Sequence, residues 1–234
     1  MKDIQAYLKR STLLADLISQ AREAGNQLVT GISGSARNLL TTMVYDELDG
    51  PIVVWAANLL QATQLYEDIS QINPTIPTFL FPVEESLAVE LAFSSPEYRS
   101  QRVEALHFLE SGEKGIVVVP TAGFKKLLAP VSIWRNHVLT FDIGNEIDFE
   151  QLPEKLVAMG YERESMVASP GEFSVRGDIM DIYALNEEYP IRIEFFGSEV
   201  DRMRFFEPTT QKSFDEAVES VRVLPAQDTI FPPY

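Results

Sequence analysis

The chain has 234 residues, 45% hydrophobic and 23% charged, which is sufficient for one large or two smaller globular domains. It contains no cysteine, so disulfides, thiolate metal sites and thiol catalysis are excluded, and its two histidines, His107 and His137, make no metal-binding spacing. The formal net charge of −16 argues against naked nucleic acid as the main ligand and favours a protein partner, because DNA binding needs clustered positive charge. No apolar run has membrane-spanning length and the N-terminus lacks a signal-peptide core, so we expect a cytoplasmic protein with no membrane partner.

The first 130 residues alternate apolar runs of strand length with stretches of helical periodicity. The expected strands are Gln27–Gly31, Pro51–Ala56, Thr78–Pro82 and Gly115–Pro120, and the expected helices are Met1–Ala24, Leu39–Leu48, Leu59–Ile72 and Pro96–Ser111. Pro51–Ala56 has the apolar composition of a buried strand, and Gly115–Pro120 is an apolar run without alternation, which is typical of a strand buried on both faces. This order predicts an α/β fold with a doubly wound, mostly parallel sheet.

The pattern changes after Pro130. We expect a strand at His137–Phe141, a helix at Phe149–Met159, and a strand at Glu219–Leu224. Between them, Gly171–Phe206 shows period-two alternation broken by turn residues, which predicts an antiparallel meander. The sequence therefore predicts a UvrB-like α/β domain over residues 1–130 and a smaller α+β module over residues 131–218, with residues 219–234 able to return to the first domain. The final residues close no element, so we expect the chain to be part of a longer protein.

A glycine-rich turn over residues 31–38, GISGSARN, has the spacing of a phosphate-binding P-loop between a predicted strand and a predicted helix. Gly31 and Gly34 suit a tight turn. However, Ala36, Arg37 and Asn38 replace the glycine, lysine and hydroxyl residue that a P-loop requires. The stretch is either a degenerate P-loop or an ordinary strand–helix turn, and in both cases we expect no ATP hydrolysis and no cofactor in this chain.

The predicted meander carries charge inside its strands. Arg176, Arg192 and Glu194 occupy positions where an ordinary core strand would have Val or Thr. An outward arginine presents a planar fork that fits a carboxylate of a partner. The pattern fits either a solvated sheet face or a binding surface.

Residues 160–204, GYERESMVASPGEFSVRGDIMDIYALNEEYPIRIEFFGSEVDRMR, closely resemble the UvrA-binding module shared by UvrB and the transcription-repair coupling factors of the Mfd family. The helix SSPEYRSQRVEALHFL and the strand GIVVVP resemble the first domain of the same proteins, so that the resemblance covers nearly the whole chain. UvrB has an intact P-loop and a long aromatic hairpin that grips damaged DNA. This chain has GISGSARN and a short FPVEESLAVELAF in those places, so it resembles the N-terminal UvrB-homology region of the coupling factors.

The resemblance implies a set of UvrA-binding residues. By motif position they are Arg163, Arg176, Arg192 and Glu194, with Phe173 expected to add apolar contact. A further family arginine falls on Ser174, which carries no charge. No catalytic or metal-binding residue is implied in this chain. Alternatively, Arg163 solvates a loop, and Arg192 and Glu194 pair with each other or with a neighbouring strand.

The implied function is recruitment of UvrA, which couples stalled transcription to nucleotide excision repair. RNA polymerase, double-stranded DNA, ATP and magnesium would then belong to the remainder of the parent protein, an ATP-dependent DNA translocase by resemblance. One alternative is a UvrB-like nucleotide-dependent DNA-binding repair enzyme, and another is an unrelated α/β enzyme with a small-molecule substrate. The altered P-loop and the net charge argue against the first alternative, and the lack of a catalytic constellation argues against the second.

Overall fold

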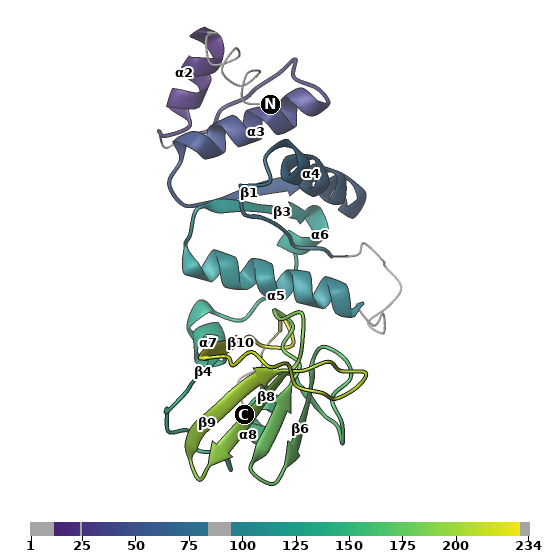
Figure 1. The fold of residues 1–234 in the computed structure, drawn as a ribbon. Coiled ribbons are helices and arrows are strands. Elements are labelled where there is room, and N and C mark those ends of the chain that lie inside the picture. Colours follow the sequence, from purple (N-terminus) through teal and green to yellow (C-terminus); the bar gives the residue numbers. More distant parts are fainter. Residues whose placement is uncertain (1–11, 24, 84–94, 230–234) are drawn as a thin grey trace. The chain divides into compact units, whose positions relative to one another are not determined.

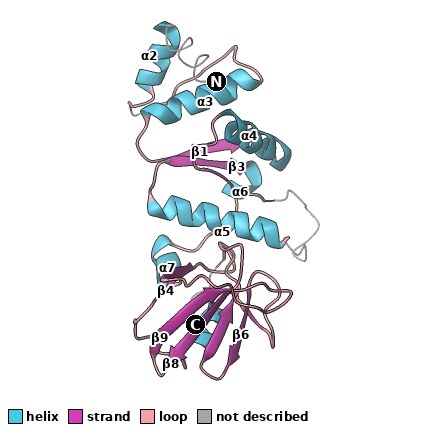
Figure 2. Ribbon diagram, in the orientation of Figure 1, coloured by secondary structure: helices cyan, strands magenta, loops and turns pink. Residues whose placement is uncertain are grey.

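The computed structural model describes residues 12–23, 25–83 and 95–229. The chain forms two compact units, one comprising Met1–Ala92 and Phe108–Lys126 and the other comprising Phe93–His107 and Leu127–Tyr234 (Figure 1). Both the helices and the strands are distributed over the two units (Figure 2). Among the helices that the structure describes, none is long and apolar enough to cross a membrane.

The first unit is built on a three-stranded parallel sheet with strand order β1-β3-β2. Its strands are β1 (Pro51–Ala56), β2 (Thr78–Leu80) and β3 (Gly115–Pro120), and its helices are α2 (Thr12–Gln20), α3 (Ser35–Glu47), α4 (Leu59–Ile72), α6 (Thr121–Phe124) and the last turn of α5 (Pro96–Ser111). Helices α4 and α5 connect successive parallel strands, as crossover connections must. The predicted α/β organisation with a parallel sheet is confirmed.

Strand β3 lies at the centre of this sheet, and all six of its residues are buried. On one face, Ile116 and Val118 pack with Ile69 of α4 in a single hydrophobic cluster. On β2, the ring of Phe79 stacks on Phe108 of α5, with 4.5 Å between the ring centroids. Coverage of both faces explains why the sequence of β3 is an uninterrupted apolar run.

Strand β1 is an edge strand, and the exposed residues along it correct the expectation that it is buried. Val53 and Trp55 are exposed, and 64% of the surface of Trp55 is accessible. The Trp55 indole Nε1 donates to Thr121 Oγ1 at 3.0 Å, and its ring lies against Phe124. An apolar run alone does not distinguish an edge strand from a central one.

The predicted strand at Gln27–Gly31 is also wrong. These residues form no strand, and Leu28 is 89% exposed. Helix α3 begins at Ser35, four residues earlier than expected. Since no strand precedes the GISGSARN turn, the strand–turn–helix architecture of a P-loop is not formed there. The predicted helix at Met1–Ala24 falls partly outside the described residues, and α2 lies in its described part.

The second unit contains a five-stranded sheet with strand order β5-β6-β7-β8-β9 and a two-stranded antiparallel sheet of β4 and β10. Its strands are β4 (Leu139–Asp142), β5 (Glu162–Arg163), β6 (Glu172–Arg176), β7 (Ile179–Ile182), β8 (Ile191–Phe196), β9 (Glu199–Phe205) and β10 (Ser220–Val223), and its helices are the first part of α5, α7 (Val131–Asn136) and α8 (Leu152–Ala158). Strands β6 to β9 pair antiparallel, as the alternation predicts, and the short β5 joins β6 in parallel.

One face of the five-stranded sheet packs on the core of the second unit. Phe173, Met180 and Ile193 are fully buried and belong to one cluster with Leu152 and Leu156 of α8. Helix α8 therefore covers the apolar face of the sheet. The opposite face carries the alternate residues of each strand, as period-two geometry requires.

The division into units differs from the expected domain boundaries in two places. Residues 93–107, which include most of α5, group with the second unit. Within that unit, Arg102 Nε donates to Asp228 Oδ2 at 2.7 Å, and both side chains are buried. The segment after residue 218 also groups with the second unit, because β10 pairs with β4 rather than returning to the parallel sheet.

Candidate functional site

The charged strand residues gather on the face of the five-stranded sheet that points away from the core. Antiparallel pairing aligns Ser174 with Asp181, Asp181 with Arg192, and Arg192 with Arg204, so these four residues form one row across β6 to β9. Directly opposed residues in paired strands project on the same side of a sheet. A neighbouring row in the same register consists of Arg176, Ile179, Glu194 and Arg202. We call the charged members of both rows, Arg176, Asp181, Arg192, Glu194, Arg202 and Arg204, the arginine face.

Asp181 is the acceptor at the centre of the arginine face. Its side chain is 1% exposed, and it receives Arg192 Nε on Oδ1 at 2.7 Å and Arg192 Nη2 on Oδ2 at 2.9 Å. Arg176 Nη2 donates to the same Oδ2. A buried carboxylate is tolerated when cations and hydrogen bonds satisfy it, and here one carboxylate fixes the direction of two guanidinium groups.

Arg192 is held on several sides. In addition to the bonds from Arg192 to Asp181, the Nη1 of Arg192 donates to the backbone carbonyl of Gln211 at 3.3 Å. The guanidinium also lies 4.5 Å from the centroid of the Phe206 ring. Gln211 has φ of 60°, and its side-chain amide donates to the carbonyls of Val167 and Pro208. The hydrogen bond from Arg192 to Asp181 raises the pKa of the guanidinium above its already high usual value, and burial acts in the opposite direction. Arg192 is therefore permanently charged and fixed in place.

Arg176 is more accessible than Arg192. Its side chain is 49% exposed, compared with 16% for Arg192. An arginine has five N–H donors, and only one nitrogen of Arg176 is engaged by Asp181. Arg176 thus presents free donors to a partner, whereas most donors of Arg192 are already occupied.

Asp181, rather than Glu194, accepts the hydrogen bonds of Arg176 and Arg192, while the negative charge of Glu194 adds to the rise in the pKa of Arg192. Within the described part of the chain, Glu194 forms no hydrogen bond or ion pair, and it lies opposite Ile179 and Arg202 in the strand register. Of the alternatives for Arg192 and Glu194, the structure shows Arg192 paired with the neighbouring strand. The sequence contained a signal for Asp181, because it alternates with core residues on its strand, but its two partners lie 5 and 11 residues away in the chain.

Two other expected residues lie apart from the arginine face. Arg163 is exposed on the short edge strand β5, in register with Phe173, which places it on the core side of the sheet edge. Phe173 itself is 0% exposed and belongs to the core, so the expectation that it supplies apolar contact to a partner is wrong. Ser174 is also buried, and its hydroxyl has no hydrogen-bond partner among the described residues.

Phe196, which the sequence analysis does not single out, offers the apolar surface that Phe173 cannot. It ends β8 and is 81% exposed. Because the preceding Phe195 is buried in the core, alternation directs Phe196 away from the core. The sequence does contain a signal for the exposure of Phe196. The residue lies at the end of a hairpin beside Gly197 and Ser198, where a large aromatic side chain has little core to pack against.

The residues of the GISGSARN turn have structural roles within the first unit. Gly31 and Gly34 adopt positive φ, at 81° and 56°, and Ala36 and Arg37 lie in the first turn of α3. Asn38 is buried, and its Nδ2 donates to Asp68 Oδ2 at 2.6 Å. Asn38 therefore binds α3 to α4 rather than facing a ligand.

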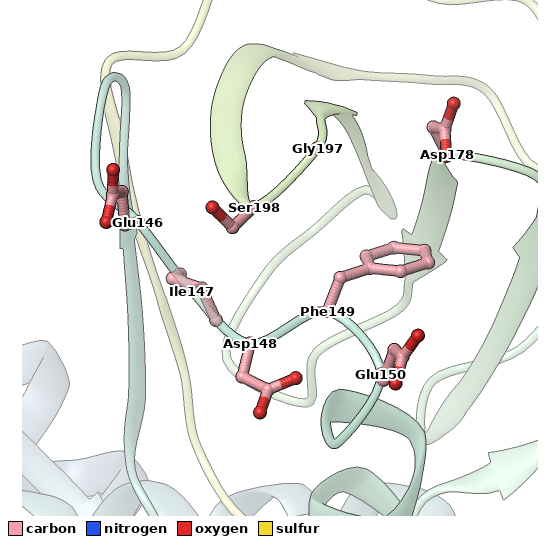
Figure 3. Close-up of a pocket in the computed structure, with 8 residues that line it drawn as sticks. All are labelled: Glu146, Ile147, Asp148, Phe149, Glu150, Asp178, Gly197 and Ser198. Atoms are coloured by element: carbon pink, nitrogen blue, oxygen red, sulfur yellow. The ribbon is translucent and has the colours of Figure 1, made fainter.

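A cleft of about 620 Å³ lies in the second unit (Figure 3). Its lining residues are Glu146, Ile147, Asp148, Phe149, Glu150, Asp178, Gly197 and Ser198. The four carboxylates are distributed around the rim and do not converge on one point (Figure 3). Among the residues that the structure describes, no group of His, Cys, Asp and Glu is arranged to hold a metal ion. The cleft thus lacks the converging groups that an acid–base or metal site requires.

The family comparison agrees with the geometry of the second unit. Residues 139–228 match the UvrB interaction domain family. This part of the second unit is therefore similar to UvrB interaction domains. The matched segment begins with β4, ends at Asp228, and contains all the residues of the arginine face. The GISGSARN turn lies outside it.

The whole chain is also similar to larger proteins. It is 39% identical to the transcription-repair-coupling factor of Bacillus subtilis (strain 168) over 234 residues, which is 100% of this chain and 20% of that protein. It is 39% identical to the transcription-repair-coupling factor of Staphylococcus aureus (strain USA300) over 230 residues, which is 98% of this chain and 19% of that protein. The chain is therefore a relative of the transcription-repair-coupling factors and spans about a fifth of their length.

Proposed function

We propose that this chain is the UvrA-recruiting region of a transcription-repair-coupling factor and that the part of the arginine face on β6 to β8, together with Phe196, binds UvrA. The observation that carries the proposal is the convergence of Arg176 and Arg192 on the buried carboxylate of Asp181 within the segment similar to UvrB interaction domains. In the parent protein, this contact would bring excision repair to stalled RNA polymerase. ATP, magnesium and double-stranded DNA would be handled by other parts of the parent.

Local charge supports a protein partner for this face. Four arginines and two carboxylates leave a formal excess of two positive charges on the arginine face, although the chain as a whole carries −16. An isolated positive patch on an acidic protein suits an acidic protein surface better than the continuous phosphate backbone of DNA. Phe196 adds an exposed aromatic of the kind that anchors interfaces.

The arginine side chains of this face are also ordered in the chain without a partner. Asp181 fixes both guanidinium groups, and the Gln211 carbonyl and the Phe206 ring hold Arg192 from other sides. Pre-ordered side chains lose less conformational entropy on binding. We therefore assign Arg176 and Phe196 to direct contact and Arg192 mainly to positioning Arg176 through Asp181.

Calorimetric titration of this chain into purified UvrA tests the proposal. The wild type should bind, and Arg176→Ala should weaken binding by about 2–5 kcal/mol if the arginine is buried against a carboxylate of UvrA. Phe196→Ala should also weaken it. Arg37→Gln removes an equivalent charge from the first unit and should have no effect. The proposal fails if the wild type does not bind, or if Arg176→Ala and Arg37→Gln behave alike.

A further inference from the structure

Arg204 lies at the β9 end of the cross-strand row that begins with Ser174 on β6. The two ends of the row differ chemically, because Ser174 is buried and neutral whereas Arg204 is half-buried and charged. They are separated by three strand spacings, or roughly 14 Å across the sheet. Positive charge on this row is therefore displaced toward β9.

The guanidinium of Arg204 is incompletely satisfied. Its Nε atom is buried and has no hydrogen-bond partner among the described residues. By contrast, Arg192 beside it on β8 donates from all three of its nitrogens. A buried charged donor without an acceptor is costly, and a partner that supplies an acceptor relieves that cost on binding.

Neither carboxylate of the arginine face supplies an acceptor for Arg204 Nε. Asp181 already accepts from Arg176 and Arg192. Glu194 lies in the neighbouring row, opposite Arg202, and does not accept a hydrogen bond from Arg204 Nε. An acceptor for Arg204 Nε would therefore have to be supplied by a group other than these two carboxylates.

We propose that Arg204 is a further contact residue for UvrA and receives a carboxylate from an acidic segment of that partner, with the exposed Arg202 extending the same positive edge along β9. This inference rests on the proposed function. It enlarges the binding surface from β6 and β8 to β9, so the acidic segment of UvrA must reach across the sheet. The guanidinium shape matters as well as the charge, because a planar fork binds a carboxylate through paired hydrogen bonds.

The test is calorimetric titration into purified UvrA with the wild type, Arg204→Gln, Arg204→Lys and Lys155→Gln. Lys155 lies on α8, which covers the opposite, apolar face of the sheet, and its replacement makes the same charge change in the same unit. Arg204→Gln should raise Kd at least tenfold and reduce its dependence on salt. Arg204→Lys should restore only part of the affinity, and Lys155→Gln should match the wild type. Circular dichroism melting checks that each variant is folded.

The outcomes separate the two proposals. If the wild type binds UvrA and Arg204→Gln binds within twofold of it, the role of Arg204 is refuted while recruitment through the remaining arginine face stands. If the wild type does not bind, the proposed function and the role of Arg204 both fall. If Arg204→Gln does not fold, Arg204→Lys and Arg202→Gln decide the matter, and wild-type affinity in both refutes the inference.

Discussion

Replacing Asp181 with asparagine should destabilise the second unit more than any other single charge removal on the arginine face. The substitution keeps the size of the side chain but removes the negative charge that two arginines share. Breaking a buried ion pair by removing one partner costs about 3–5 kcal/mol. Arg192 retains the Gln211 carbonyl and 16% exposure, and asparagine keeps one acceptor oxygen, so we expect the lower limit, about 3 kcal/mol. Arg176 is half exposed and adds at most about 1 kcal/mol.

Urea denaturation followed by tryptophan fluorescence measures this effect. Trp134 is buried in the second unit and Trp55 lies in the first, so a Trp55→Phe background leaves Trp134 as the single reporter. Asp178→Asn is the matched control, because it removes the same charge from an exposed position in the turn between β6 and β7. A loss below about 1 kcal/mol for Asp181→Asn, or an equal loss for Asp178→Asn, would refute the assignment of Asp181 as the centre of the face.

Three further predictions concern the same unit. Phe173→Ala should lower the free energy of unfolding by about 3–5 kcal/mol, because it empties a fully buried site, whereas a folded Phe173→Leu should bind UvrA as the wild type does; weakened binding by Phe173→Leu would restore Phe173 as a contact. Asp228→Asn should cost about 3 kcal/mol in the same urea assay, because it removes the negative charge that pairs with the buried Arg102, and an unchanged midpoint would count against that pair. Burial raises the pKa of the Glu104 carboxyl, against an opposing hydrogen bond from Ser100, so the folded state binds this proton more tightly and stability falls as pH rises through the raised pKa. Glu104→Gln should therefore be more stable than the wild type at pH 7–8, with the difference vanishing near pH 4, and equal stability at both pH values would contradict the shift.

The antiparallel meander was predictable because its strands bury one face only. Residues such as Ile191 and Ile193 alternate with Arg192 and Glu194, and this period-two pattern fixes which side chains face the core. Asp181, which the sequence analysis does not single out, follows the same alternation and lies on the outer face. The alternation could not show that Asp181 lies between Arg176 and Arg192, because strand register is set by pairing between segments and by turn geometry.

The expectations that are wrong in the first unit concern apolar segments whose pairing and burial depend on neighbouring strands. Gln27–Gly31 is apolar enough for a strand, yet it has no strand to pair with and leaves Leu28 exposed. Pro51–Ala56 does form a strand, but it lies at the edge of the sheet, where Trp55 packs against the neighbouring Phe124. Local apolar character indicates a strand without specifying its neighbours, and burial depends on those neighbours.

Arginine-selective labelling of the chain with and without UvrA, read by mass spectrometry, tests the central claim most directly. The reagent phenylglyoxal modifies accessible guanidinium groups, and Arg176 and Arg37 are both exposed, one on each unit. The account predicts that UvrA protects Arg176 from modification and leaves Arg37 unchanged. Protection of Arg37 with continued labelling of Arg176, or no protection of either at saturating UvrA, would contradict it.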